Sequence, residues 1–334
     1  MARLTLDVAT ETLRLAAPFH IAGHIFETSD VVVVTLGDGL HRGRGEASGV
    51  FYLDDDLVNM TAALAACRTT IEAGPSREEL RQILPPGGAR NAIDCALWEL
   101  EAARAGRPVW ALADVGEPRP LRTTFTIGAD APAAMALIAT GYAQARSIKV
   151  KLTGDVDLDL ARVAAIRTAR PDVWLGVDGN QGFVRAQLDA LLPRLADHGV
   201  ELVEQPLARG RDADLEGLAS PIRIAGDESI CSLEDVAGAV GRFDVINIKL
   251  DKCGGLTEGL LMAAEARRLG LGVMVGTMVG TSLATAPGFV LGQVCDLVDL
   301  DGSTFLVADR APSVVYANGT VWSGPEVWGS GAAA

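Results

Sequence analysis

Long uninterrupted apolar runs are missing from this 334-residue sequence, although 49% of its residues are hydrophobic. No run reaches the ~18 residues that a membrane-spanning helix needs. Positive charge is also scarce, because 29 Lys and Arg stand against 43 Asp and Glu, a formal net charge of −14. So acidic a chain is poorly suited to the phosphates of nucleic acid or to an anionic membrane. We therefore expect no nucleic acid and no membrane among its partners.

Cysteine is sparse, with five residues and no C-x-x-C pair. An odd number of scattered cysteines predicts free thiols rather than a disulfide framework, which is typical of a reducing compartment. The segment Met1–Asp7 lacks the apolar stretch of a signal peptide. We therefore predict a cytoplasmic protein.

Several catalytic motifs are absent as well. The four histidines have no metal-ligand spacing, and the sequence contains no H-E-x-x-H, G-x-S-x-G, P-loop or strand-borne G-x-G-x-x-G pattern. These absences argue against zinc proteases, serine hydrolases, P-loop enzymes and ordinary dinucleotide-binding enzymes.

The length exceeds the usual ~100–200 residues of one domain, so we expect two domains or a barrel with additions. The first third has an α+β pattern, with strands expected over Leu4–Leu15 and Val31–Leu36 and near Gly45–Ala47. Helices are expected over Leu57–Ala73 and Ala89–Ala105.

From about Leu121, short apolar runs alternate with helical stretches. Such alternation predicts parallel strands joined by crossovers, and eight strands favour a closed barrel. The alternative, a doubly wound open sheet, usually has fewer strands and needs a phosphate loop that this chain lacks. The expected barrel strands are Thr124–Ile127, Ile148–Leu152, Val173–Asp178, Val200–Glu204, Ile222–Asp227, Val245–Leu250, Val273–Gly276 and Leu297–Asp301.

Three successive strands of this barrel end in a carboxylate, at Asp178, Glu204 and Asp227. Reactive groups of such barrels lie at the carboxyl ends of the strands, so the three should converge. Converging carboxylates stay ionised only beside a cation, and an all-oxygen ligand set suits Mg²⁺. Alternatively, each residue caps the helix that follows its strand.

Lysines occupy two strands of the same barrel. Lys149 and Lys151 share one face of their strand, where two nearby ammonium groups should lower each other's pKa and free an amine to act as a base. Lys249 lies four strands further on, on the opposite wall of an eight-stranded ring. Two amines on either side of a carbon suit removal of a proton from one face and its return to the other, the geometry of a racemase or epimerase. The alternatives are exposed lysines on an edge strand and a structural Lys249.

Together these segments resemble the enolase superfamily, and more narrowly its muconate-lactonizing branch, which carries K-x-K on the second barrel strand and a lysine on the sixth. The segment Val298–Gly302 resembles the D-x-D of the dipeptide epimerases, of which L-Ala-D/L-Glu epimerase is the familiar member. Met274–Ser282 is similar to the same group. The motifs that carry the resemblance are Lys149–Lys151, Val177–Gln181, Glu204–Pro206, Gly226–Ser229 and Asn247–Lys252.

The resemblance implies a modified TIM barrel of (β/α)7β type, over residues 119–312, with an α+β capping domain over residues 1–118 against which the tail 313–334 packs. It implies that Asp178, Glu204 and Asp227 hold one Mg²⁺ per subunit and that the substrate carboxylate binds this ion. Lys151 and Lys249 become the acid–base pair. We also expect a homo-oligomer, by family habit.

The implied reaction is a 1,1-proton transfer that inverts the α-carbon of the C-terminal residue of a dipeptide through an enediolate. Lys149 would assist Lys151 and face the carboxylate, and Asp299 and Asp301 would bind the α-ammonium group. Without the resemblance, these two aspartates read equally well as a turn or a helix cap. Open alternatives are cycloisomerisation, syn-dehydration of the o-succinylbenzoate synthase kind, racemisation of an N-modified amino acid, and an inactive ligand-binding protein.

One stretch departs from the expected pattern. Relatives specific for Ala-Glu tend to carry an arginine in the capping-domain loop that closes over substrate, and the corresponding loop Phe19–Asp30 has none. This absence leaves room for an apolar or differently charged substrate side chain. His20, His24 and Phe26 in this loop, and Phe51 in a second, apolar loop, are the candidate residues for that pocket. Solubility of the loop and packing of the capping domain explain these residues equally well.

Overall fold

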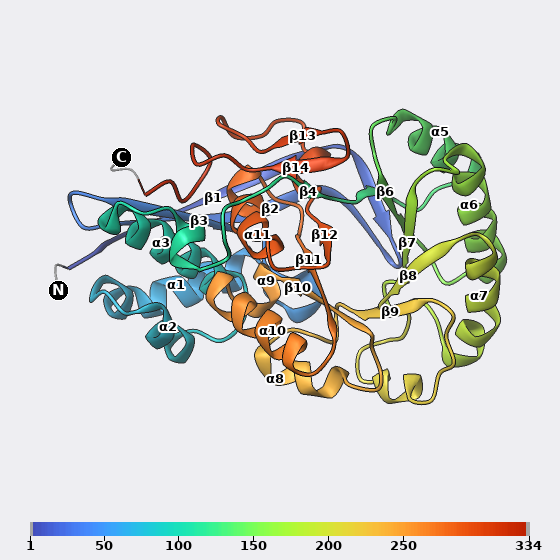
Figure 1. The fold of residues 1–334 in the computed structure, drawn as a ribbon. Helices are drawn as coiled ribbons and strands as arrows, with labels where there is room; N and C mark the ends of the chain where they lie inside the picture. The colour runs from blue at the N-terminus through green and yellow to red at the C-terminus, as the bar shows by residue number, and fades with distance from the viewer. Residues whose placement is uncertain (1–2, 332–334) are drawn as a thin grey trace.

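The computed structural model describes residues 3–331 and divides into a barrel and a cap that packs against it (Figure 1). The cap begins with an antiparallel sheet in the order β1 (Thr5–Ile21), β2 (His24–Gly37) and β3 (Arg42–Ala47). Three helices cover it: α1 (Leu57–Glu72), α2 (Arg77–Ile83) and α3 (Gly88–Ala105). Alternation along β2 places Val32, Val34 and Leu36 in the buried layer under these helices.

The cap is closely packed where α3 crosses β3. A Cβ on Gly43 would lie 2.0 Å from the Ala96 carbonyl oxygen, and one on Gly45 would lie 2.0 Å from that of Ala92. Only glycine therefore allows the strand and the helix to approach this closely.

The region Phe19–Asp30 is not the loop that we predicted. Phe19–Ile21 ends β1 and His24–Asp30 begins β2, with His20 paired to Ile25. The aromatic and β-branched residues here favour strand, and Gly23 adopts φ +72°, which permits the tight turn between them. The region is therefore the far end of a long hairpin.

The eight barrel strands are parallel, and each pairs with the next. A hydrogen bond of 3.0 Å from the Thr124 N–H to the Val298 carbonyl joins the first strand to the last. The predicted barrel is confirmed. Its strands are β5 (Phe125–Ile127), β6 (Ser147–Lys151), β7 (Trp174–Asp178), β8 (Val200–Glu204), β9 (Arg223–Gly226), β10 (Val245–Lys249), β11 (Gly272–Gly276) and β12 (Leu297–Asp299).

Helices cover the outside of the barrel and bury the outward-facing apolar residues of the strands (Figure 1). The long ones are α5 (Pro132–Gly141), α6 (Val156–Ala169), α7 (Arg185–Asp197), α10 (Leu256–Arg268) and α11 (Ser282–Gly292). The shorter helices of the chain are α4 (Val109–Leu112), α8 (Leu233–Val236) and α9 (Leu250–Cys253). One 3-10 turn lies in the cap at Phe51–Leu53, and others follow at Asp212–Leu215, Ala237–Ala239 and Gly302–Phe305. No helix within residues 3–331 is long and apolar enough to cross a membrane.

The chain after the barrel returns to the cap. Strands β13 (Val315–Ala317) and β14 (Thr320–Trp322) form a small sheet with β4 (Leu121–Arg122). Further on, the Gly329 carbonyl accepts from the Val109 N–H at 2.9 Å, and the Gly329 N–H donates to Glu99 of α3 at 3.1 Å. Residues 1–2 and 332–334 of the predicted domain ranges lie outside the described residues.

The β1–β2 hairpin reaches from the cap helices to the mouth of the barrel (Figure 1). The His20 carbonyl accepts from the Ala129 N–H, just after β5, at 3.0 Å. The Ser29 hydroxyl donates to the Val279 carbonyl, just after β11, at 2.6 Å. The tip of the hairpin thus spans the end of the barrel at which the predicted carboxylates and lysines lie.

Candidate active site

The three predicted metal ligands end neighbouring strands of the barrel. Asp178 on β7 is in register with Glu204 on β8, and Asp227 follows β9 directly. All three are almost fully buried. One carboxylate oxygen from each lies within 4.8 Å of the other two. The structure therefore brings together the carboxylates that the sequence placed on separate strands.

Polar side chains hold these carboxylates in place. Lys151 Nζ donates to Asp178 Oδ2 at 2.7 Å, and Lys249 Nζ donates to Asp227 Oδ2 at 2.6 Å. Asn247 Nδ2 donates to Glu204 Oε1 at 2.9 Å, and Lys252 Nζ donates to Asp227 Oδ1 at 2.6 Å. These roles of Asn247 and Lys252 were not predicted from the sequence, although both residues stand in the motif around Lys249.

The cluster fits a divalent cation. The buried Glu204 Oε2 has no hydrogen-bond partner in the structure, although Lys149 Nζ lies 2.7 Å away without hydrogen-bond alignment. Burial and the neighbouring Asp178 raise the pKa of Glu204 to about 8. A cation among three oxygen ligands would supply the positive charge that this carboxylate lacks, and Mg²⁺ prefers such ligands.

Lys149 differs from our prediction of a lowered lysine pKa. Its Nζ lies 2.8 Å from Asp299, 2.7 Å from Glu204 and 3.1 Å from Asp178. Burial alone would lower the pKa of Lys149, but these carboxylates outweigh it and raise the pKa well above its ordinary value. Our prediction rested on repulsion between the two lysines of one strand. Attraction to the acids on neighbouring strands is stronger and raises the pKa of Lys149 instead.

Lys151 and Lys249 line one pocket and come from β6 and β10, with three strands between them. Each is paired with a carboxylate of the cluster. Burial acts to lower the pKa of Lys249, but Asp227 more than compensates, and the pKa lies above its usual value. Two buried amines thus reach one cavity from different walls of the barrel.

The two aspartates of the D-x-D motif lie deep beside the cluster. Asp299 Oδ1 accepts from the Thr124 hydroxyl, and Asp299 Oδ2 accepts from Lys149. Asp301 Oδ2 accepts from the Thr126 N–H at 2.6 Å. Burial and the nearby Asp299 raise the pKa of Asp301 to about 7. Neither aspartate is among the residues that line the pocket, so binding of an ammonium group here stays a prediction.

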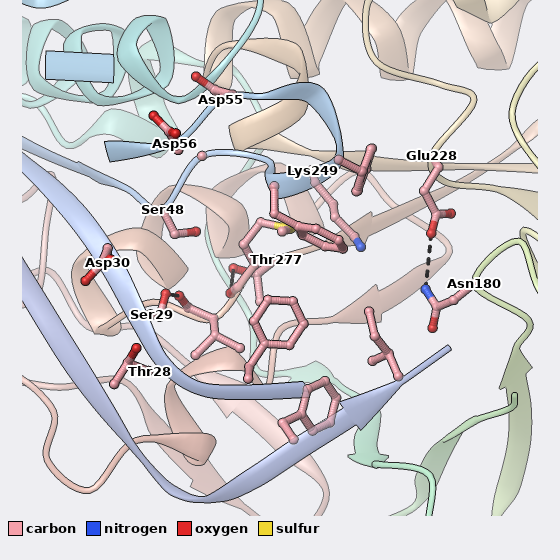
Figure 2. A pocket seen from close by; sticks show the side chains of 18 of the residues that line it. Thr28, Ser29, Asp30, Ser48, Asp55, Asp56, Asn180, Glu228, Lys249 and Thr277 are labelled. Carbon is pink, nitrogen blue, oxygen red and sulfur yellow. Dashed lines mark hydrogen bonds between the residues drawn. The ribbon is translucent and has the colours of Figure 1, made fainter. Parts of the chain in front are cut away.

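The pocket has a volume of about 250 Å³ and lies between barrel and cap (Figure 2). Across its barrel side, Asn180 Nδ2 donates to Glu228 Oε1 at 3.2 Å. The cap contributes the hairpin tip and the turn that contains Phe51 and Tyr52. Its lining is Phe19, Ile21, Phe26, Thr28, Ser29, Asp30, Ser48, Gly49, Phe51, Tyr52, Asp55, Asp56, Leu57, Lys151, Asn180, Asp227, Glu228, Lys249, Thr277, Met278 and Val279.

Three of our four candidates from the cap, His24, Phe26 and Phe51, form one aromatic cluster. The His24 ring lies 4.2 Å from that of Phe26 and 4.9 Å from that of Phe51, measured between centroids. Phe26 and Phe51 line the pocket, whereas His24 borders a neighbouring hollow with His20 and Arg162. His24 therefore reaches the pocket only through the two phenylalanines.

The sequence reasoning missed several lining residues. Asn180 and Glu228 stand directly beside predicted ligands in the quoted motifs, and this proximity could have identified them. Tyr52 carries a buried hydroxyl without a partner in the structure, and burial followed by the charges of Asp227 and Glu228 raises its pKa. Nothing in the local sequence distinguishes Tyr52 from an ordinary packing residue.

Comparison with known proteins assigns the two parts of the chain. Residues 131–308 match the model described as Enolase C-terminal domain-like, and residues 3–113 match the N-terminal domain of mandelate racemase / muconate lactonizing enzyme. The chain belongs to the mandelate racemase / muconate lactonizing enzyme family. The predicted family and the barrel with its capping domain are thereby confirmed.

Within this family the chain is similar to enzymes that act on dipeptides. It is 38% identical over 315 residues to the L-Ala-D/L-Glu epimerase of Escherichia coli K12, covering 94% of this chain and 98% of that protein. An Agrobacterium tumefaciens enolase family member with homology to dipeptide epimerases, solved with sodium and L-Ala-L-Glu, is 40% identical with a TM-score of 0.94, covering 98% and 100% of the chains. The Methylococcus capsulatus dipeptide epimerase, solved with Mg and L-Arg-D-Lys, is 30% identical with a TM-score of 0.89, covering 96% of each chain.

Proposed function

We propose that this protein is a Mg²⁺-dependent dipeptide epimerase, an isomerase that inverts the α-carbon of the C-terminal residue of a dipeptide. The observation that carries the proposal is the pair Lys151 and Lys249, which reach one pocket from different walls beside three converging carboxylates. The similarity to dipeptide epimerases over more than nine-tenths of the chain supports it.

In this proposal Asp178, Glu204 and Asp227 would hold the cation, which would supply positive charge for binding the substrate carboxylate. Bound Mg²⁺ would supply positive charge where the carboxylate gains negative charge as the α-proton leaves. Lys252 and Asn247 hold two of the three carboxylates in place by donating to Asp227 and Glu204.

Lys151 and Lys249 then move the proton. One lysine in its neutral form takes the α-proton from one face, and the other, as an ammonium group, donates a proton to the opposite face. When the other epimer is the substrate, the two lysines exchange these roles. The raised pKa of Lys249 beside Asp227 favours its ammonium form, which is the form that donates.

Asp299 and Asp301 serve as the site for the dipeptide's α-ammonium group in this proposal. A free ammonium group is bound best by carboxylates through charge-assisted hydrogen bonds. Lys149 already pairs with Asp299 at 2.8 Å, so this lysine links the ammonium site to the carboxylate cluster. Phe26 and Phe51 form the wall next to the substrate side chain, and His24 packs behind them.

The domain boundaries, the cellular location and the oligomeric state also belong to this proposal. The capping domain comprises residues 1–118 with the tail 313–334, and residues 119–312 form the catalytic barrel. The free state of all five cysteines supports a cytoplasmic enzyme. We further propose a homo-oligomer, which light scattering of the purified protein would test.

A dipeptide library incubated with Mg²⁺ in D₂O tests the function. Incorporation of deuterium at the α-carbon of the C-terminal residue, with loss of stereochemical purity, is the expected result and is read by mass and chiral chromatography. A lactone precursor, an acyl sugar acid and N-acylated amino acids serve as comparison substrates. Turnover of one of these without exchange in any dipeptide would reject the proposal in favour of cycloisomerisation, dehydration or N-modified amino acid racemisation. Binding of a dipeptide without exchange or turnover of any compound would indicate an inactive ligand-binding protein.

A further inference from the structure

One carboxylate of the barrel holds two consecutive backbone groups of the cap. Asp251 Oδ1 accepts from the Ser48 N–H at 3.0 Å and from the Gly49 N–H at 3.3 Å. Asp251 is 4% exposed, and burial raises its pKa because neutral donors do not replace the water that its charge has lost. A buried carboxylate with neutral partners costs stability, so the fold alone gives no reason for an acid at this position.

Asp251 belongs to the same short segment as one of the two pocket lysines. Strand β10 ends at Lys249, and α9 begins at the next residue. Lys249 Nζ and Lys252 Nζ both donate to Asp227, each at 2.6 Å, whereas Asp251 between them contacts the cap. The segment therefore contacts the carboxylate cluster with two side chains and the cap with a third.

Residues 48–56, the cap turn, are tightly folded beyond this contact. The Val50 N–H donates to the Asp55 carbonyl at 3.0 Å, and the Asp55 N–H donates to the Val50 carbonyl at 3.3 Å. Gly49 adopts φ +69°, and a Cβ on it would lie 1.9 Å from the Asp55 carbonyl oxygen. Because the two ends of the turn are bonded to each other, a shift at Ser48 and Gly49 would move the turn as one piece.

The cap turn is one wall of the pocket. Its centre is the 3-10 turn Phe51–Leu53, and the Phe51 ring lies 5.2 Å from that of Phe26 on the hairpin, measured between centroids. Figure 2 shows Ser48 and Lys249 in the same pocket. The residues of the turn that line the pocket are Ser48, Gly49, Phe51, Tyr52, Asp55 and Asp56.

We infer that Asp251 is a positioning residue, which fixes the cap turn to the segment that carries Lys249 and thereby sets the room available to the substrate side chain. The inference rests on the proposed function for what enters the pocket. Asp251 is not among the lining residues, so it acts through the backbone of Ser48 and Gly49. Its effect falls on binding of the substrate side chain and not on the proton transfer.

Three variants and a matched control test this role. Asp251→Ala removes the acceptor, Asp251→Asn keeps an oxygen that can accept, and Asp251→Ser is a shorter polar replacement that serves if the alanine variant does not fold. Asp94→Ala is the control, because buried Asp94 also joins cap to barrel by accepting from a backbone N–H, that of Thr257, at 2.9 Å. Neither Asp94 nor Thr257 lines the pocket.

The first measurement needs no turnover. The chain has three tyrosines, Tyr52, Tyr142 and Tyr316, so labelling with 3-fluorotyrosine gives three ¹⁹F resonances, and Tyr52→Phe identifies the one from the cap turn. Asp251→Ala should shift or broaden the Tyr52 resonance and leave the other two in place. Asp251→Asn and Asp94→Ala should leave the Tyr52 resonance where it is.

The second measurement is α-deuteration in D₂O with Mg²⁺. The substrates are L-Ala-L-Ala and the most active dipeptide whose C-terminal side chain has at least about four heavy atoms. For the larger peptide, Asp251→Ala should raise KM about 10-fold or more and change kcat less than about threefold, because a lost wall removes binding and not chemistry. L-Ala-L-Ala, whose methyl group does not extend to the wall, should keep kcat/KM within about threefold. Asp251→Asn should restore the KM of the larger peptide.

Each outcome decides one of the two proposals. An unmoved Tyr52 resonance in Asp251→Ala overturns the positioning role, as does the same change in Asp94→Ala or a failure of Asp251→Asn to restore KM. An equal loss for both peptides, or a loss confined to kcat, also overturns it. Exchange in no dipeptide rejects the epimerase function, while the ¹⁹F spectra still show whether Asp251 positions the turn.

Discussion

Lys149 Nζ lies 2.8 Å from Asp299 Oδ2 and joins the second barrel strand to the first aspartate of the D-x-D motif. The same amine lies 2.7 Å from Glu204. This lysine therefore connects the group proposed to receive the substrate ammonium with the group proposed to hold the cation. Substitution of Asp299 should therefore weaken binding of the substrate's α-ammonium group more than it slows the proton transfer.

Substitution of Asp299 by asparagine should weaken recognition of the free α-ammonium group. We expect kcat/KM for a free dipeptide to fall about 10- to 100-fold, with most of the change in KM, because a charge-assisted contact is lost. The N-acetylated form of the same dipeptide, which has no ammonium group, should lose much less. An equal loss for both peptides would show that Asp299 does not bind the amine.

Each of the two pocket lysines, Lys151 and Lys249, should be required for the reaction. Lys151→Ala and Lys249→Ala should each lower epimerisation by about 10²- to 10⁴-fold, the range for loss of a general base or acid. Circular dichroism and Mn²⁺ binding verify that each variant is folded and keeps its cation site. Near-normal epimerisation by either variant would remove that lysine from the mechanism.

Removal of divalent metal should abolish activity and leave the protein folded, because the fold does not depend on the carboxylate cluster for its core. Dialysis against EDTA should eliminate α-deuteration, and added Mg²⁺ should restore it. The Glu204→Gln variant should bind Mn²⁺ at least about 10-fold more weakly in electron paramagnetic resonance titrations, since one anionic ligand is lost. Unchanged Mn²⁺ affinity in this variant would argue against the proposed ligand set.

Asp251 should make stability depend on pH. Its carboxylate accepts from the Ser48 N–H at 3.0 Å, and burial raises its pKa to about 7. The folded state thus keeps a proton that the unfolded chain releases near pH 4, so this group's contribution is complete below pH 4 and is lost as pH rises toward 7, by up to about 1.4 kcal/mol per pH unit.

The Asp251→Asn variant isolates this contribution. Asparagine stays neutral at every pH and keeps an oxygen for the Ser48 N–H. Urea unfolding at pH 4.5 and at pH 7.5 should therefore show the variant gaining stability relative to the unsubstituted protein as pH rises. A constant difference between the two proteins would mean that Asp251 does not titrate in this window.

Glu46 should be important for stability because its side chain is fully buried between cap and barrel. It accepts from the Thr281 N–H at 2.7 Å and pairs with Arg310 at 2.7 Å. Glu46→Ala leaves these partners without their anion and should reduce the free energy of unfolding by about 3–5 kcal/mol. The surface pair of Glu265 with Arg268 is the control, for which Glu265→Ala should change the free energy of unfolding little, because solvent screens this pair. Similar losses in the two variants would contradict the assigned role of Glu46.

Much of the barrel and its reactive end could be predicted because both follow from local patterns. Alternating strands and helices specify parallel pairing, and a residue that ends such a strand must lie at one end of the barrel. Asp178, Glu204 and Asp227 were found in this way, without knowledge of which strands are neighbours.

The features of the fold and the site that were not predicted depend on contacts between segments that are distant in the sequence. The pKa of Lys149 is governed by Asp299, 150 residues further along the chain, and no local pattern reveals this pairing. We predicted a loop at the hairpin tip because the family resemblance places a closing loop there, whereas pairing of His20 with Ile25 continues the sheet. The roles of Tyr52 and Asp55 in the pocket lining arise only when the cap packs on the barrel.

The hairpin that spans the barrel mouth also bears on how such an enzyme can diverge. Residues from Phe19 to Asp30 form a single short stretch of chain, and the backbone carbonyl of His20 fastens it to the barrel by accepting from the Ala129 N–H. A backbone anchor tolerates replacement of the residue that supplies it. Point mutations in this stretch could therefore alter which molecules are admitted, one generation after another, while the groups at the strand ends keep their positions.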